Sequence, residues 1–95
     1  MSAYLIANVR VTDAVQYEQY KKLSTLAMQA HGAELCVRGG AATVLEGDWS
    51  PDRIVILKFP SVEKARAFYE SAEYVRAREA REGAAIMRMV VVEGL

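Results

Sequence analysis

Apolar and polar residues alternate over residues 3–11, and this two-residue period predicts a β-strand. One side of the strand carries only apolar residues: Leu5, Ala7, Val9 and Val11. The other side is mixed: Tyr4, Ile6, Asn8 and Arg10. The same alternation predicts strands over residues 33–38, 53–59 and 85–93. We expect the apolar sides to meet helices and the mixed sides to line a cleft or a partly polar dimer interior.

Two stretches with helical spacing separate these strands. The first follows Asp13, a typical N-cap residue, with Gln16 placed to complete a capping box, and Gly32 marks its end. The second begins after Pro60-Ser61, and Ser71 is placed to cap a further helical stretch that ends near residue 83. Residues 42–46 either continue the second strand or pair as a hairpin arm.

The order strand, helix, strand, strand, helix, strand predicts one α+β domain over residues 1–95. It is the split βαβ, or ferredoxin-like, arrangement, with an antiparallel sheet and two helices on one face. The helix-free face would carry isoleucines at positions 6, 54 and 56 beside polar groups that include Lys58. Packing two such sheets face to face hides the isoleucines, so we expect a homodimer with polar groups lining an enclosed space.

Composition narrows the function classes. Twelve lysines and arginines balance twelve aspartates and glutamates, so neither nucleic acid nor an anionic membrane surface is an expected partner. The amino terminus does not have the pattern of a signal peptide, and no apolar run is long enough to span a bilayer. A single cysteine, Cys36, excludes an internal disulfide. The expected location is therefore the cytoplasm.

Several separate motifs resemble one known family. They are Val37-Arg38-Gly39-Gly40, Leu45-Glu46-Gly47-Asp48-Trp49, Phe59-Pro60-Ser61, Phe68-Tyr69-Glu70-Ser71-Ala72-Glu73-Tyr74 and Val92-Glu93-Gly94. Together they resemble the bacterial domain-of-unknown-function family 1330, within the dimeric α/β-barrel superfamily. The resemblance implies a sheet-on-sheet homodimer but no established reaction. It leads us to expect proline and tryptophan where this chain has Ala72 and Phe68.

Polar residues on the mixed strand faces are the first candidates for a binding site. Simple alternation places Arg38 on the helix-free face, where its guanidinium would clamp a carboxylate or enolate, or instead form an ion pair with Glu34, Glu46 or a residue of the partner chain. Asn8 and Arg10 would orient ligand oxygens, or form hydrogen bonds between strands or subunits. Arg88 and Lys58 are weaker candidates.

Aromatic residues supply the remaining candidates. Trp49, in a turn, would close the cavity as an apolar plug or form one wall of a pocket. Tyr74 and Tyr69 would donate a phenolic proton to an oxyanion, or simply pack. His31 fits C-cap stabilisation better than a general base, and Cys36 is not expected to be reactive. Methionines 28, 87 and 89 are interpreted as packing residues.

The sequence predicts no metal site and no cofactor, because no ligand cluster or nucleotide-binding motif is present. Two hypotheses follow. One is a pocket between sheet and helices for an anionic or aromatic metabolite, in a protein resembling a cofactor-independent monooxygenase or isomerase. The other is a non-catalytic metabolite-binding or purely structural dimer module. The sequence leaves open whether the protein is an enzyme.

Overall fold

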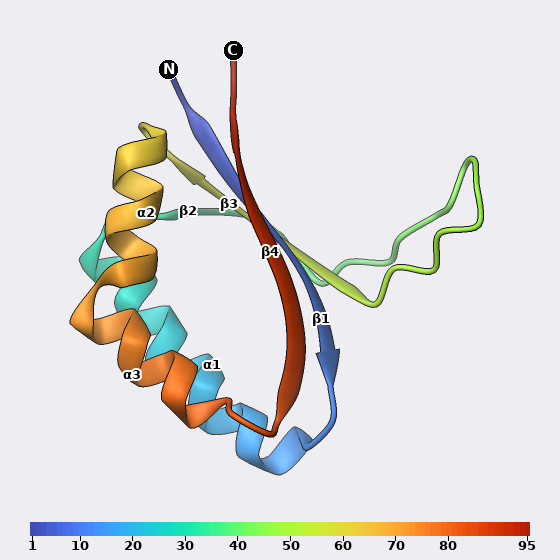
Figure 1. Ribbon diagram of the computed structural model, residues 1–95, viewed down its shortest axis with the longest axis horizontal. Helices are drawn as coiled ribbons and strands as arrows, with labels where there is room; N and C mark the ends of the chain where they lie inside the picture. Colours follow the sequence, from blue (N-terminus) through green and yellow to red (C-terminus); the bar gives the residue numbers. More distant parts are fainter.

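The computed structural model describes residues 1–95 as a four-stranded antiparallel sheet with helices on one face (Figure 1). Its elements are β1 (Ala3–Val11), α1 (Ala14–Ala30), β2 (Glu34–Arg38), β3 (Arg53–Phe59), α2 (Val62–Glu70), α3 (Ala72–Ala80) and β4 (Ala85–Glu93). The strand order is β2-β3-β1-β4, and β1 is antiparallel to both of its neighbours. The predicted split βαβ arrangement is therefore confirmed.

The helix ends are set by side chains that the sequence singled out. The Asp13 carboxylate accepts a hydrogen bond from the Gln16 amide nitrogen at 3.1 Å, as an N-cap should. The Gln16 side chain does not complete the capping box but donates to the carbonyls of Ala80 and Glu82. The start of α1 is thereby tied to the end of α3.

Ser71 divides the second helical stretch in two. Its hydroxyl donates to the Phe68 carbonyl at 2.7 Å and accepts from the Tyr74 amide at 3.1 Å. One side chain therefore ends α2 and caps α3, as its position predicted, and the sheet is covered by three helices rather than two.

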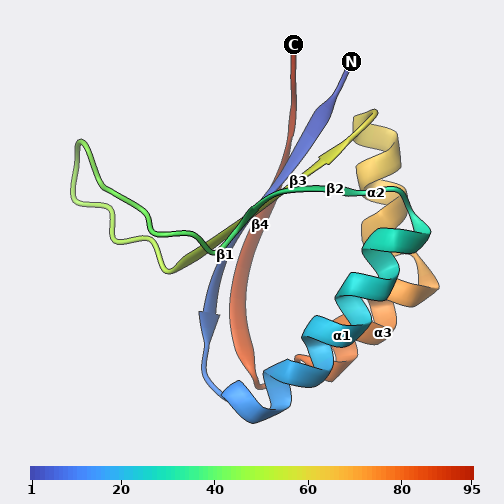
Figure 2. The ribbon, with the colours of Figure 1, turned by 180° about the vertical axis from the view of Figure 1, so that it is seen from behind.

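The core fills the layer between the sheet and the helices. The side of β1 predicted to be apolar is buried as far as Val9, and Phe59 and Phe68 are the largest fully buried side chains. Their ring centroids lie 5.2 Å apart, in the tilted geometry that aromatic pairs prefer. Helix α1 packs mainly on α3 rather than on the sheet, and Figure 2 shows the two helices side by side.

A β-bulge in β2 overturns one expectation. Leu35 pairs with Leu57, but Val37 pairs with Ile56, so Cys36 is the extra residue and the alternation shifts by one. Arg38 is therefore paired with Val55 and lies on the helix side of the sheet. Its predicted place on the helix-free face is wrong, because a one-residue slip moves every later side chain to the other face.

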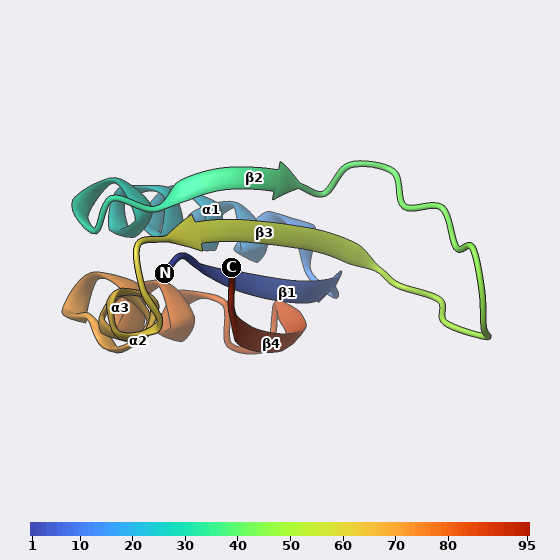
Figure 3. The same ribbon diagram turned by 90° about the horizontal axis from the view of Figure 1, so that it is seen from above.

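Residues 39–52, which we call the arm, join β2 to β3 without regular secondary structure. Residues 42–46 form no strand, so the predicted continuation or hairpin is wrong. Figure 3 shows the arm projecting beyond the sheet, away from the helices. None of the three helices combines the length and apolar character that crossing a membrane requires.

Candidate functional site

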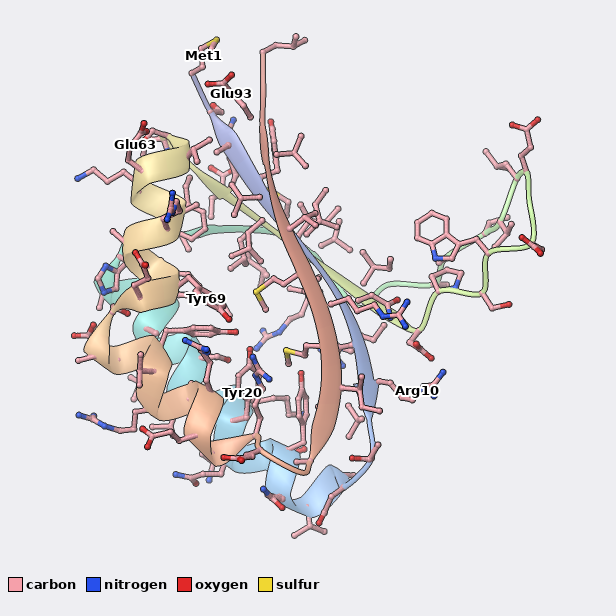
Figure 4. The ribbon with its side chains drawn as sticks, in the orientation of Figure 1. Met1, Arg10, Tyr20, Glu63, Tyr69 and Glu93 are labelled. Atoms are coloured by element: carbon pink, nitrogen blue, oxygen red, sulfur yellow. The ribbon has the colours of Figure 1, made fainter.

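The predicted site residues separate into two groups on opposite faces of the sheet. Arg38 and Tyr74 line a cavity between the sheet and the helices. Asn8, Arg10 and Trp49 line a hollow on the other face, which we call the open face. Figure 4 shows this separation, with Tyr20 pointing into the space between the helices and β4, and Arg10 on the far side of β1.

The cavity has a volume of about 50 Å³ and mostly apolar walls. The sheet contributes small and flexible side chains: Leu5, Ala7, Val9, Leu57, Met87 and Met89. The helices contribute Met28, Phe68 and three tyrosines, Tyr17, Tyr20 and Tyr74. This volume holds a few water molecules. A larger ligand requires the walls to move, and the three methionines allow it because their unbranched side chains repack readily.

Three cationic side chains lie at one end of the cavity, and only one of them is paired with an acidic residue. Lys21, Arg38 and Arg53 line both the cavity and the adjoining surface hollow, whereas no Asp, Glu or His lines the cavity. Lys21 is paired with Glu18 at 2.9 Å, but neither arginine makes a salt bridge. The cavity end therefore carries uncompensated positive charge.

Arg53 is the residue that sequence reasoning missed. Its Nε atom is buried and has no hydrogen-bond partner, an arrangement that costs about 1–3 kcal/mol when nothing satisfies the donor. Its position in the strand was the available signal, since residue 53 shares the side of residues 55, 57 and 59 that faces the helices. A charged residue at the start of an otherwise apolar strand face indicates a candidate binding site.

Gly39 makes room for the Arg53 side chain. A Cβ atom at residue 39 would lie 2.8 Å from both Cγ and Nε of Arg53, and the glycine has a φ of +70° that other residues rarely adopt. The Gly39 amide also donates to the Ile54 carbonyl at 2.7 Å. Of the two glycines that the sequence singled out, Gly39 permits the close approach of an arginine, whereas no atom lies within 4 Å of a Cβ placed at Gly40.

Two tyrosine hydroxyls meet in the wall of the cavity. The Tyr20 and Tyr74 oxygens lie 2.7 Å apart and are buried. Burial raises the pKa of both phenols, and for Tyr20 the neighbouring Tyr74 raises it further, so both remain protonated at neutral pH. One hydroxyl donates to the other, which leaves one O–H free to donate to a third group. Tyr74 lines the cavity and is also part of the core, so its predicted role as a phenolic donor remains a prediction.

Asn8 and Arg10 are engaged in holding the base of the arm. The Asn8 side chain donates to the Asp52 carboxylate at 3.1 Å and accepts from the Asp52 amide at 2.9 Å. Arg10 Nε lies 3.6 Å from the same carboxylate. These contacts favour the hydrogen-bonding interpretation of both residues over ligand binding.

Trp49 does not close the sheet–helix cavity. It is 64% exposed and, with Arg88, lines the open-face hollow of about 550 Å³. The expectation that it acts as a lid on the cavity is therefore wrong, because the sheet stands between the two.

The remaining candidates have structural contacts. His31 caps α1 and its Nε2 atom lies 2.9 Å from Glu73 Oε1, a hydrogen bond that lowers the pKa of the Glu73 carboxyl. The Arg78 guanidinium lies 4.3 Å above the Tyr69 ring. Cys36 is exposed at the bulge. No three of the His, Cys, Asp and Glu side chains form a cluster able to hold a metal ion.

Comparison with known proteins shows the fold and the family to which this chain belongs. The chain has the α+β ferredoxin-like fold, which solved structures share over nearly its whole length. It belongs to the family described as domain of unknown function 1330, whose model matches residues 2–95. No protein of curated function matches the chain in sequence.

Three solved structures illustrate the likeness in fold. A protein of unknown function from Rhodopseudomonas palustris has a TM-score of 0.77 and 21% identity, covering 99% of this chain and 82% of its own. A dimeric protein of unknown function from Bacteroides fragilis has a TM-score of 0.66 and 10% identity, covering 98% and 96%. SnoaB, a cofactor-independent oxygenase from Streptomyces nogalater, has a TM-score of 0.66 and 7% identity, covering 99% and 93%. At these identities the likeness concerns the fold alone.

Proposed function

We propose that the protein is a homodimer in which each subunit binds a small, partly apolar anion in the cavity between sheet and helices. The observation that carries the proposal is the buried Arg53 Nε: like Arg81 Nε it has no partner within the chain, and unlike Arg81 it belongs to a residue that lines the cavity. An anionic oxygen at this point would accept from Arg53 and remove the cost of the unsatisfied donor. Arg38 lies at the same end of the cavity and adds to the attraction.

The residues that line the cavity indicate which class of ligand it could bind. Apolar and aromatic walls suit a flat hydrocarbon body, whereas the arginine end suits a carboxylate, enolate or phenolate oxygen. The free O–H of the Tyr20–Tyr74 pair provides a second donor. We therefore expect an aromatic or enolic anion with its charge at the end of the cavity near residues 38 and 53.

Homodimer formation is supported by the open face. Ile86, Val90 and Val92 of β4 are each about half exposed on it, which is unusual for neighbouring apolar residues of a monomer. The structurally similar Bacteroides fragilis protein is described as dimeric. A face-to-face pairing of two sheets would bury these residues.

A catalytic role is the second candidate. The cavity lacks a carboxylate or imidazole to accept a proton, so it suits an anion that ionises by itself rather than one that a general base must create. The free phenolic donor and the two arginines would stabilise such an enolate or phenolate during reaction. The fold likeness to a cofactor-independent oxygenase makes oxygenation the first reaction to test, with isomerisation second.

A thermal-shift experiment tests the proposal with matched anionic and neutral probes. Benzoate and 4-hydroxybenzoate are compared with benzamide and 4-hydroxybenzamide at fixed protein concentration. An anion present at 100 times its Kd stabilises the protein by about 2.7 kcal/mol, which raises Tm by on the order of 10 °C in a domain of this size. The amides should give a much smaller shift, and equal shifts for acid and amide would overturn the anion site.

A further inference from the structure

The arm, residues 39–52, has no core of its own. All its residues except Pro51 are exposed, and they include Leu45 at 93% and Trp49 at 64%. Long irregular loops are uncommon in small domains and usually carry a function. When large apolar side chains gather on an exposed segment, they often mark an interaction surface.

The base of the arm is fixed although its tip is free. Asp52 is held by Asn8 and Arg10, and Gly39 is bonded to the Ile54 carbonyl at 2.7 Å. Both ends of the segment are thus attached to the sheet. The direction in which the arm projects is therefore set by the fold.

That direction points to the side of the open face. In Figure 1 the helices lie on one side of the sheet and the arm on the other. Arm residues share hollows with open-face side chains, Trp49 with Arg88 and Leu45 with Ile54. A subunit that paired through its own open face would lie beside this arm.

The charges of the arm complement those of the open face. Apart from Asp52, which is held by Asn8 and Arg10 of its own chain, the arm carries Glu46 and Asp48 and no lysine or arginine. The open face carries the cations Lys58 and Arg88 among its isoleucines and valines, with Glu34 opposite Lys58, and its third cation, Arg10, is paired with Asp52 of the same chain. In a two-fold dimer that pairs the open faces, the acidic, apolar arm of each subunit would be complementary to the cations and apolar residues of the other subunit's open face.

We propose that the arm packs on a second copy of this chain. Leu45 and Trp49 are then buried against the open face of the other subunit, and Glu46 lies near the cations of that face. This inference rests on the proposed homodimer and adds to it a specific contact. The arm is then a dimerisation element, and its exposure in the single chain is removed on assembly.

Trp49 is the only tryptophan, so its fluorescence reports on the arm alone. Emission and acrylamide quenching are followed on serial dilution, with sedimentation velocity on the same samples. We expect a blue-shifted, protected indole in the dimer that becomes red-shifted and quenchable as the dimer dissociates. A dimer whose indole is fully quenchable would overturn the arm contact while leaving the homodimer intact. A monomer at every concentration would overturn both.

A pair of matched variants gives a second measurement. Leu45→Ser removes an exposed leucine of the arm, and Leu26→Ser removes one that is 60% exposed on α1, on the opposite side of the sheet. Neither side chain belongs to the core, so both variants should keep the far-UV circular dichroism of the native fold. Leu45→Ser should raise the dimer dissociation constant about tenfold, whereas Leu26→Ser should leave it unchanged. Equal effects of the two variants would contradict the proposal.

Discussion

On the open face, both polar atoms of the Asn8 side chain are hydrogen-bonded to Asp52, and Arg10 is paired with the Asp52 carboxylate. On the helix-covered face, Arg53 keeps a buried Nε without a partner, and Arg38 makes no salt bridge. Both groups of residues begin as polar positions in strands. They differ in whether other residues of the same chain provide hydrogen-bond or salt-bridge partners for them.

This difference separates structural polar residues from candidate binding residues. A polar group that is already hydrogen-bonded loses those bonds when a ligand takes its place, so binding there brings little gain. A buried donor without a partner gains the full value of a new bond. The sheet–helix cavity is therefore the better candidate site, although its volume is only about 50 Å³ against about 550 Å³ for the open-face hollow.

The largest expected effect is on ligand affinity in Arg53→Met. Losing a hydrogen bond to a charged group costs about 1.5–3 kcal/mol, so the anion with the largest thermal shift should bind about 10–100 times more weakly in titration calorimetry. The free energy of unfolding of the ligand-free protein should not fall, because the buried Nε has no partner to lose. Arg76→Met, at an exposed position on α3, is the matched control. If Arg53→Met bound the anion with unchanged affinity, the sheet–helix cavity would be excluded as the binding site.

Tyr74→Phe should reduce the stability of the protein by about 1–3 kcal/mol, because the Tyr20 hydroxyl loses its buried partner. Urea unfolding measures the change, and Tyr69→Phe, at a half-buried tyrosine of α2, serves as the control. The double variant Tyr20→Phe/Tyr74→Phe should be less destabilised than the sum of the single variants, since it leaves no unpaired hydroxyl. Strict additivity would show that the two hydroxyls do not interact.

The pH dependence of stability at alkaline pH provides a second test of the Tyr20–Tyr74 pair. Burial raises the pKa of Tyr20 and Tyr74 above their ordinary value of 10.0 in the folded protein. Their protonated forms are thus favoured by folding, so stability is fully present below about pH 10 and is lost as the pH rises toward the folded-state pKa values. The free energy of unfolding should fall between about pH 9 and pH 11 more steeply in the wild type than in the double Phe variant. Identical slopes would mean that these phenols are accessible to water.

Much of the fold was predictable because its signals are local. Alternation fixed β1 and β3 to the residue, and the caps at Asp13 and Ser71 follow from side chains that bond the nearest backbone amides. The two-residue period also predicted which side of β1 and β3 faces the helices, whereas the packing of α1 on α3 was not predicted. Local chemistry and tertiary structure agree in these segments.

The site was predicted less well, because its geometry depends on a bulge. The sequence Leu35-Cys36-Val37-Arg38 has the same hydrophobic pattern with or without an extra residue, so nothing local indicated that Arg38 turns to the helices. The exposed Val44 and Leu45 have strand-like composition but find no pairing partner within the chain. Arg53 was detectable only by asking which charged residue shares the apolar side of its strand.

The smallest expected effect is in Asn8→Ala, and it tests the open face directly. Removing the amide breaks two hydrogen bonds to Asp52 that are exposed to solvent, so the stability should fall by only about 1 kcal/mol. The affinity for the anion should remain that of the wild type, because the sheet separates Asn8 from the cavity. The mobility of the Trp49 indole, measured by fluorescence anisotropy at low protein concentration, should increase as the base of the arm loosens. Loss of anion binding in Asn8→Ala, with the mobility of the Trp49 indole unchanged, would contradict the proposed site. The polar residues of the open face would then bind the ligand, and those of the cavity would be structural.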